Sequence, residues 1–153
     1  MDEARRLRAT EYFTARLAEE ARRAERYVRH FAVIFVSCRR ANPRDVFNNI
    51  RPQLRCTDIV EVIRGRRHKP SGDVYAAPVG GSKDGGPTPR DQVAVILPET
   101  DRAGAEVVVD RLRSHLLAMP DLKLGLSTYP EDSESPHDLL AKAAAAAGDT
   151  FRP

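Results

Sequence analysis

The sequence predicts one domain, residues 1–153, with an α/β fold of the α+β type, in which helices pack against an antiparallel sheet. A chain of 153 residues can bury one hydrophobic core but is too short for two independent ones. Short apolar runs with β-branched residues alternate with helical patterns along the chain. No apolar stretch approaches the roughly 18 residues that a membrane-spanning helix needs, so we expect no membrane contact.

The first half of the chain predicts two helices and two strands. Residues 4–28 are rich in Ala, Arg and Glu, and their apolar residues fall mostly three or four apart, which indicates a long amphipathic helix. The continuous apolar run at 31–38 indicates a strand buried on both faces, at the centre of the sheet. Pro43 fits the first turn of a short helix that Pro52 bends or shortens. A second strand is expected at 58–63.

A long loop separates the two halves of the chain. Residues 64–90 are rich in proline and glycine and lack aliphatic periodicity, so we expect an inserted loop at 65–90 with a brief strand at 73–76. The remaining elements are a third strand, a helix with Asp101 as its N-cap, a fourth strand and a last helix closed by Gly148, at residues 92–97, 101–117, 122–128 and 135–147.

The element order predicts how the sheet is built. A helix followed by β-α-β-β-α-β-α favours a ferredoxin-like sheet that contains an antiparallel hairpin. We expect the helices to pack on one face of this sheet.

Charge and cysteine use bear on location and partners. The N-terminus is charged and lacks the apolar segment of a secretory signal, so we expect a cytoplasmic protein in which Cys38 and Cys56 are reduced. The net charge is +3 and the basic residues are mostly arginine, which suits phosphate or carboxylate partners. Basic and aromatic residues are not interleaved, so specific nucleic-acid binding is not expected. The histidines are scattered, and we expect neither a metal site nor a cofactor.

Several segments together resemble the GGDEF domain, the diguanylate cyclase family of bacterial signalling. The segment from Asp91 to Thr100, with its Val-Ala-Val-Ile-Leu-Pro core, is similar to the family's hairpin strand. The segment Leu124-Gly-Leu-Ser-Thr-Tyr-Pro-Glu-Asp132 is similar to the strand and turn that follow in the family. The resemblance implies a nucleotide-cyclase-like sheet and spans nearly the whole chain, apart from the loop.

The catalytic groups that the resemblance implies are missing. Joining two GTP molecules requires divalent metal, which the family holds with carboxylates from its first strand and from its hairpin turn. The matching first-strand positions are Ser37 and Arg39, and the turn reads Pro89-Arg-Asp-Gln-Val93. Gln92 replaces one acid of the turn and Asp91 remains alone. The stretch between the first two strands is also too short for the family's guanine pocket. We therefore predict that the chain is not an enzyme.

A second family site remains in the sequence. Active members bind their product, cyclic di-GMP, at an inhibitory site made by an Arg-x-x-Asp sequence before the hairpin and an arginine on the following helix. Arg55-Cys-Thr-Asp58 and Arg111 match these positions. A guanidinium can donate to guanine O6 and N7, and a carboxylate can accept from guanine N1–H and N2–H. The alternative is that Arg55 and Asp58 are a relic ion pair at the surface, worth about 0–1 kcal/mol.

These observations leave two hypotheses for function. The first is a catalytically inactive GGDEF-like receptor that binds cyclic di-GMP through Arg55, Asp58 and Arg111 and reports to a protein partner or an attached signalling domain. The second is a protein-interaction or dimerisation module with no nucleotide ligand, in which the long first helix or the loop would dock. A homodimer is compatible with either hypothesis. The helix that begins near residue 3 suggests an upstream neighbour in a longer protein.

Overall fold

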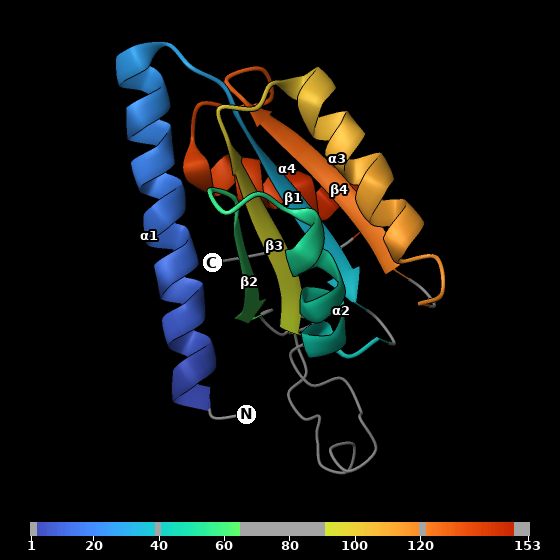
Figure 1. The fold of residues 1–153 in the computed structure, drawn as a ribbon. Helices are drawn as coiled ribbons and strands as arrows, with labels where there is room; N and C mark the ends of the chain where they lie inside the picture. Colours follow the sequence, from blue (N-terminus) through green and yellow to red (C-terminus); the bar gives the residue numbers. More distant parts are fainter. Residues whose placement is uncertain (1–2, 39–40, 65–90, 120–121, 149–153) are drawn as a thin grey trace, which may run out of the picture.

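The computed structural model describes residues 3–38, 41–64, 91–119 and 122–148 (Figure 1). Along the chain, the elements are α1 (Glu3–Tyr27), β1 (Phe31–Cys38), α2 (Pro43–Ile50), the 3-10 helix η1 (Arg51–Gln53), β2 (Ile59–Arg64), β3 (Asp91–Pro98), α3 (Arg102–His115), β4 (Leu122–Tyr129) and α4 (Pro136–Ala146). This order confirms the predicted one. The loop predicted at 65–90 and its strand at 73–76 lie outside the described residues. None of the described helices is long and apolar enough to span a membrane.

The four strands form one antiparallel sheet with the order β2-β3-β1-β4. Strand β1 lies between β3 and β4, so that Phe31 pairs with Pro98 on one side and with Tyr129 on the other. The rings of Phe31 and Tyr129 stack with their centroids 5.1 Å apart. The β-α-β-β-α-β connection with this strand order is the ferredoxin-like arrangement, and it confirms the predicted central position of residues 31–38.

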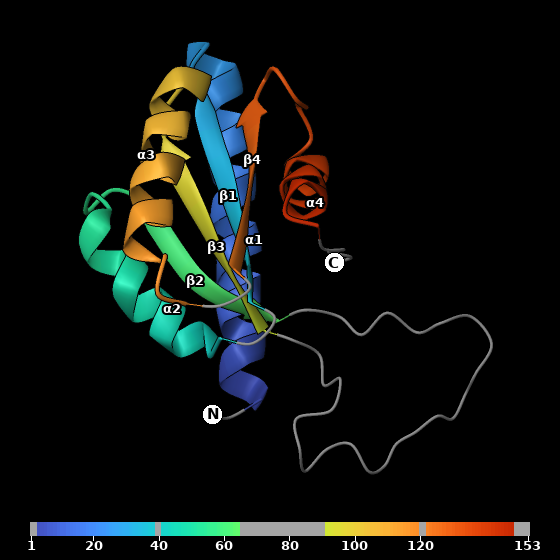
Figure 2. The same ribbon diagram turned by 90° about the vertical axis from the view of Figure 1, so that its right-hand side faces the viewer.

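Helices cover both faces of the sheet (Figure 2). One core joins the sheet to α1 and α4 through residues such as Phe13 and Leu139, and the other joins it to α2 and α3 through residues such as Ile50 and Leu112. The expectation that the helices pack on one face is therefore wrong for α1 and α4. The reason lies in β1, because all eight of its residues are buried and both of its faces need an apolar cover.

The helix ends follow the signals in the sequence. Asp101 accepts a hydrogen bond from the Gly104 backbone N–H at 2.9 Å and so caps α3. Helix α2 ends at Ile50, and Pro52 lies in the 3-10 turn that follows. Gly148 has a φ of +75° just after α4, the left-handed conformation that glycine adopts most easily.

Helix α4 approaches β4 closely at Gly125. A Cβ atom at this position would lie 2.0 Å from the Ala143 carbonyl oxygen and 2.5 Å from the Ala147 backbone nitrogen. These neighbours are backbone atoms, which cannot rotate away as a side chain can. The glycine therefore sets the distance between the helix and the sheet.

We predict that Gly125→Ala destabilises the fold, because α4 must move away from β4. Overpacking of this kind typically costs about 1–3 kcal/mol of unfolding free energy, which urea denaturation would measure. Gly104→Ala is the matched control, since its Cβ meets side-chain atoms at 3.1 and 3.3 Å and it improves helix propensity. Equal stability of the two variants would contradict the prediction.

Candidate functional site

The Arg-x-x-Asp sequence forms a closed turn between η1 and β2. The Asp58 backbone N–H donates to the Arg55 carbonyl at 3.0 Å, and Asp58 Oδ2 accepts from the Arg55 backbone N–H at 2.8 Å. An aspartate that folds back onto its own turn is a common local motif. The Asp58 side chain is only 3 % exposed as a result. Its carboxylate therefore fixes the turn from which Arg55 projects.

The Arg55 side chain reaches from this turn to the end of β3. Its Nη2 donates to Thr100 Oγ1 at 2.9 Å, to Asp58 Oδ1 at 3.3 Å and to the Pro98 carbonyl at 3.4 Å. Each of these contacts uses the same nitrogen, although a guanidinium has five N–H groups. The side chain remains 60 % exposed. Arg55 is thus held in one place and still presents a charged group at the surface.

Arg55 lines two neighbouring hollows. Arg111 projects from α3 into the same hollow as Arg55, a space of about 770 Å³ that Tyr27, His30 and Thr100 also line. Asp58 does not line this hollow but borders a second one of about 600 Å³, between α1 and the turn. The structure therefore brings Arg55 and Arg111 together across one hollow, while Asp58 lies beside it, under Arg55.

The sequence did not predict three residues of this site, Thr100, Arg29 and Glu99. Thr100 accepts from Arg55 and itself donates to the Pro98 carbonyl at 2.9 Å, which places it under the guanidinium. Arg29, just after α1, forms an ion pair of 2.7 Å with Glu99, which has a φ of +52°. Nothing in the local sequence marks these residues, because Arg29 meets Glu99 and Arg55 meets Thr100 only when α1 and β3 end, and β2 begins, at the same end of the sheet.

Two carboxyl groups of the second hollow have raised pKa values. Burial raises the pKa of Glu20 on α1, and the nearby Arg23 and Arg16 oppose that effect. Burial also raises the pKa of Glu61 on β2. The negative charge on both groups is therefore less favourable than it would be in water.

Two of the positions that the resemblance assigns to a metal site, Ser37 and Gln92, hold neutral side chains. Ser37 is fully buried in β1. Gln92 is 3 % exposed, and its Oε1 accepts a hydrogen bond from the Cys38 backbone N–H at 2.5 Å. A hard divalent ion prefers anionic oxygen ligands, so Ser37 and Gln92 do not fit a magnesium site. Arg39 and the turn residues Pro89 and Arg90 lie outside the described residues.

Within the described part of the chain, no three His, Cys, Asp or Glu residues are grouped so that they could hold a metal ion. Cys38 is buried at the end of β1, and Cys56 is exposed in the Arg55 turn.

Comparison with known proteins identifies the fold. The sequence matches no family model, and no curated protein is significantly similar to it. Among solved structures, the GGDEF domain of YfiN from Pseudomonas aeruginosa is 23 % identical with a TM-score of 0.62, over 90 % of this chain and 86 % of that one. A sensory box/GGDEF family protein from Caulobacter crescentus is 18 % identical with a TM-score of 0.60, over 88 % and 86 % of the two chains.

A third similar structure is a diguanylate cyclase in a complex. It is SiaD from Pseudomonas aeruginosa, solved with its activator SiaC, and it is 15 % identical with a TM-score of 0.57. The match covers 90 % of this chain and 52 % of SiaD, so this chain spans about half the length of that protein. Together these similarities confirm that the chain has a GGDEF-like α+β fold.

We predict that Gln92→Ala destabilises the domain, because the buried Cys38 N–H loses this acceptor. Leaving a buried donor without its acceptor costs about 1–3 kcal/mol of unfolding free energy, measurable by urea denaturation. Asn48→Ala, at an exposed position on α2, is the control and should change stability by no more than about 0.5 kcal/mol. A Gln92→Ala variant as stable as this control would show that the hydrogen bond does not hold β3 to β1.

Proposed function

We propose that this chain is a catalytically inactive GGDEF-like signalling domain that acts in the cytoplasm as a receptor for cyclic di-GMP. One observation carries the proposal: Arg55 and Arg111, from elements far apart in the sequence, line the same hollow. These two arginines match the inhibitory-site positions of the family that the fold resembles. If Arg55 and Asp58 formed only a surface ion pair, there would be no reason for Arg111 to line the same hollow.

The chemistry of this hollow suits a guanine nucleotide with phosphate groups. A guanidinium can donate two hydrogen bonds to guanine O6 and N7, and it can lie flat against a purine. The hollow, at about 770 Å³, falls within the usual size range of ligand sites. Gly104 and Asp101, at the N-terminus of α3, also line it, and because the Gly104 N–H already donates to Asp101, the phosphate groups would depend on the two arginines.

Asp58 serves this proposed site in two ways. In the described conformation its carboxylate is occupied by the Arg55 backbone N–H and guanidinium, so it positions the arginine. We also propose that Asp58 accepts from guanine N1–H and N2–H. To do so, its carboxylate must give up its hydrogen bonds to Arg55 and bind the base instead. The larger contribution in our proposal therefore comes from Arg55 and Arg111.

The absence of catalysis is part of the proposal. Synthesis of cyclic di-GMP from GTP needs metal-bound carboxylates, and the side chain of Gln92 is instead bonded to the backbone of β1. Ser37 adds no charge at its position. A domain that has Arg55 and Arg111 but lacks the metal-binding carboxylates can bind cyclic di-GMP without synthesising it.

A second candidate is a protein-interaction or dimerisation module without a nucleotide ligand. Tyr27 is more than half exposed and Val28 is 90 % exposed, next to each other at the end of α1. Adjacent exposed apolar residues are a feature of docking surfaces. For both candidate functions, we propose that the domain transmits its signal to a protein partner or an attached domain.

We predict that isothermal titration calorimetry detects binding of cyclic di-GMP to the purified chain. Arg55→Ala and Arg111→Ala should each lower the affinity about tenfold or more, because a hydrogen bond to a charged group contributes about 1.5–3 kcal/mol. Arg113→Ala is the matched control, since Arg113 lies on the same helix and pairs with Asp110. No heat with the unaltered chain, or an unchanged affinity in Arg55→Ala, would reject the proposal.

We also predict that the chain makes no cyclic di-GMP from GTP and Mg²⁺. The products would be separated by anion-exchange chromatography, with an active diguanylate cyclase run in parallel as the positive control. Accumulation of the linear dinucleotide or of cyclic di-GMP would disprove the assignment of Ser37 and Gln92 as non-catalytic.

A further inference from the structure

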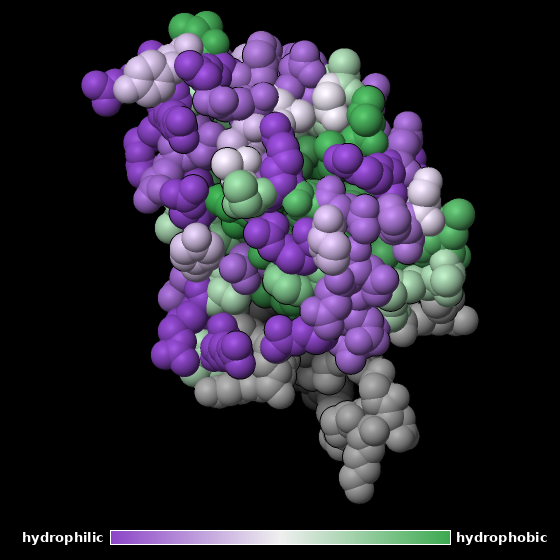
Figure 3. Space-filling view, viewed as in Figure 1, coloured by the Kyte–Doolittle hydropathy of each residue, from purple (hydrophilic) through white to green (hydrophobic). Residues whose placement is uncertain are grey.

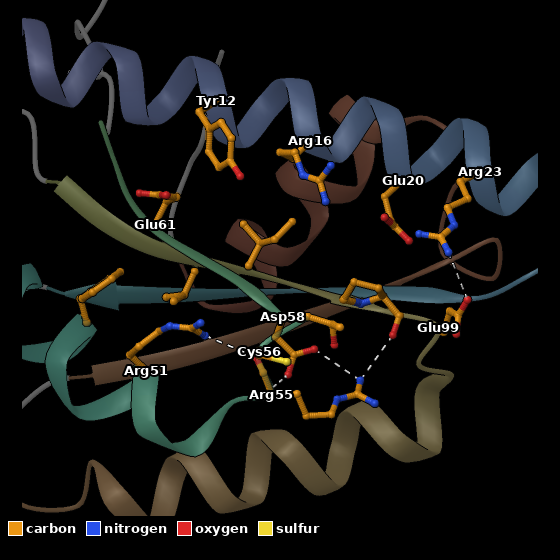
Figure 4. Close-up of a pocket in the computed structure, with 15 residues that line it drawn as sticks. Tyr12, Arg16, Glu20, Arg23, Arg51, Arg55, Cys56, Asp58, Glu61 and Glu99 are labelled. Carbon is orange, nitrogen blue, oxygen red and sulfur yellow. Dashed lines mark hydrogen bonds and ion pairs between the residues drawn. The ribbon is translucent and has the colours of Figure 1, made fainter.

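The hollow that Arg55 and Arg111 share also contains an ion pair. Arg29 and Glu99 both line this hollow, although they are 70 positions apart in the sequence. Arg29 Nη1 lies 2.7 Å from Glu99 Oε1. Arg23 on α1 lies 3.7 Å from the same carboxylate oxygen (Figure 4). The proposed nucleotide site therefore contains a third arginine, which is held by an acid.

The backbone beside this ion pair adopts a conformation that is uncommon outside glycine. Val28 and Glu99 each have a φ of +52°, and within the described residues they are the only non-glycine residues with a positive φ. For a β-branched residue such as valine, this left-handed conformation is a genuine outlier. Backbone outliers are found most often at binding sites and other functional sites. Both outliers line the same hollow, and they lie in the two segments that the ion pair joins.

The ion pair is accessible to water and to a ligand. The side chains of Arg29 and Glu99 are 52 % and 46 % exposed. Hydrophilic side chains cover most of the face that contains α1 and α3 (Figure 3). An exposed ion pair contributes little to stability, because water solvates both charges when they separate. A phosphate group can therefore take the Arg29 guanidinium from Glu99 at little cost.

The other acid of the hollow has a different role. The Asp101 carboxylate accepts from the Gly104 backbone N–H at 2.9 Å and so caps α3. Glu99 instead contacts the guanidinium groups of Arg29 and Arg23. Glu99 is therefore the acid that competes with a phosphate group for an arginine of this hollow.

We propose that Arg29 is a third phosphate-binding arginine of the nucleotide hollow, and that Glu99 limits the affinity of the hollow by holding Arg29. Cyclic di-GMP has two phosphodiester groups, and a guanidinium binds phosphate oxygens through charge-assisted hydrogen bonds. On binding, Arg29 exchanges the Glu99 carboxylate for a phosphate oxygen, and Glu99 keeps Arg23 as its partner. This inference rests on the proposed function, because the ligand is the same.

The first test compares the affinity of the unaltered chain and of Glu99→Gln for cyclic di-GMP by isothermal titration calorimetry. The substitution releases Arg29 and keeps the size of the side chain. The affinity should therefore rise about two- to fivefold, as expected when one exposed ion pair no longer competes. Glu19→Gln is the matched control and should leave the affinity unchanged, since Glu19 pairs with Arg16 at 2.8 Å and lies outside the lining of the hollow. A gain in affinity cannot come from a variant that folds poorly.

A second substitution separates contact with phosphate from the removal of a negative charge. In the Glu99→Gln background, Arg29→Ala should lower the affinity about three- to tenfold, because a partly exposed charged hydrogen bond to the ligand is lost. An arginine that only neutralised Glu99 would have no effect in that background. Arg22→Ala in the same background is the control, since Arg22 is exposed on α1 and lies outside the lining of the hollow.

The outcomes distinguish this inference from the receptor proposal. No binding by the unaltered chain rejects the receptor and, with it, the role of Arg29. Suppose instead that the unaltered chain binds, but that Glu99→Gln gives no gain or Arg29→Ala gives no loss in that background. This result overturns the role of Arg29 alone and leaves the receptor in place. A gain in the first variant and a loss in the second support both.

Discussion

The burial of β1 on both faces is the constraint on which the rest of the structure depends. Eight consecutive buried residues require strands on both edges and apolar helices on both faces. Strands β3 and β4 meet the first requirement, and the two helix pairs α1–α4 and α2–α3 meet the second. The ends of α1 and β3 and the turn before β2 then meet at one end of the sheet. There Arg55 bonds to Pro98 and Thr100, and Arg29 pairs with Glu99.

Arg55 connects the two hollows at this end of the sheet. Its backbone N–H and its Nη2 donate hydrogen bonds to the Asp58 carboxylate. The same Nη2 also donates to Thr100 Oγ1 and to the Pro98 carbonyl. An arginine held by several partners loses less conformational entropy when it binds a ligand. Arg55 is thus positioned for recognition in the hollow that it shares with Arg111, which we propose as the nucleotide site.

The two sites that the family resemblance implies lie at different ends of β3. At the beginning of this strand, Gln92 is bonded to the Cys38 backbone, where the family's chemistry needs an anion. At the other end, Pro98 and Thr100 support Arg55. The residues between the two ends are buried, and the two sets of contacts share no side chain.

The sequence by itself determined the element order, the central position of residues 31–38, and the helix caps at Asp101 and Gly148. These features are local, because they depend on hydrophobic period, turn chemistry or residue type. Only the tertiary structure decided that α1 and α4 cover a second face, that Arg55 donates to Thr100, and that Arg29 pairs with Glu99. Such contacts join residues tens of positions apart, and the chain carries no local signal for a partner that only folding brings near.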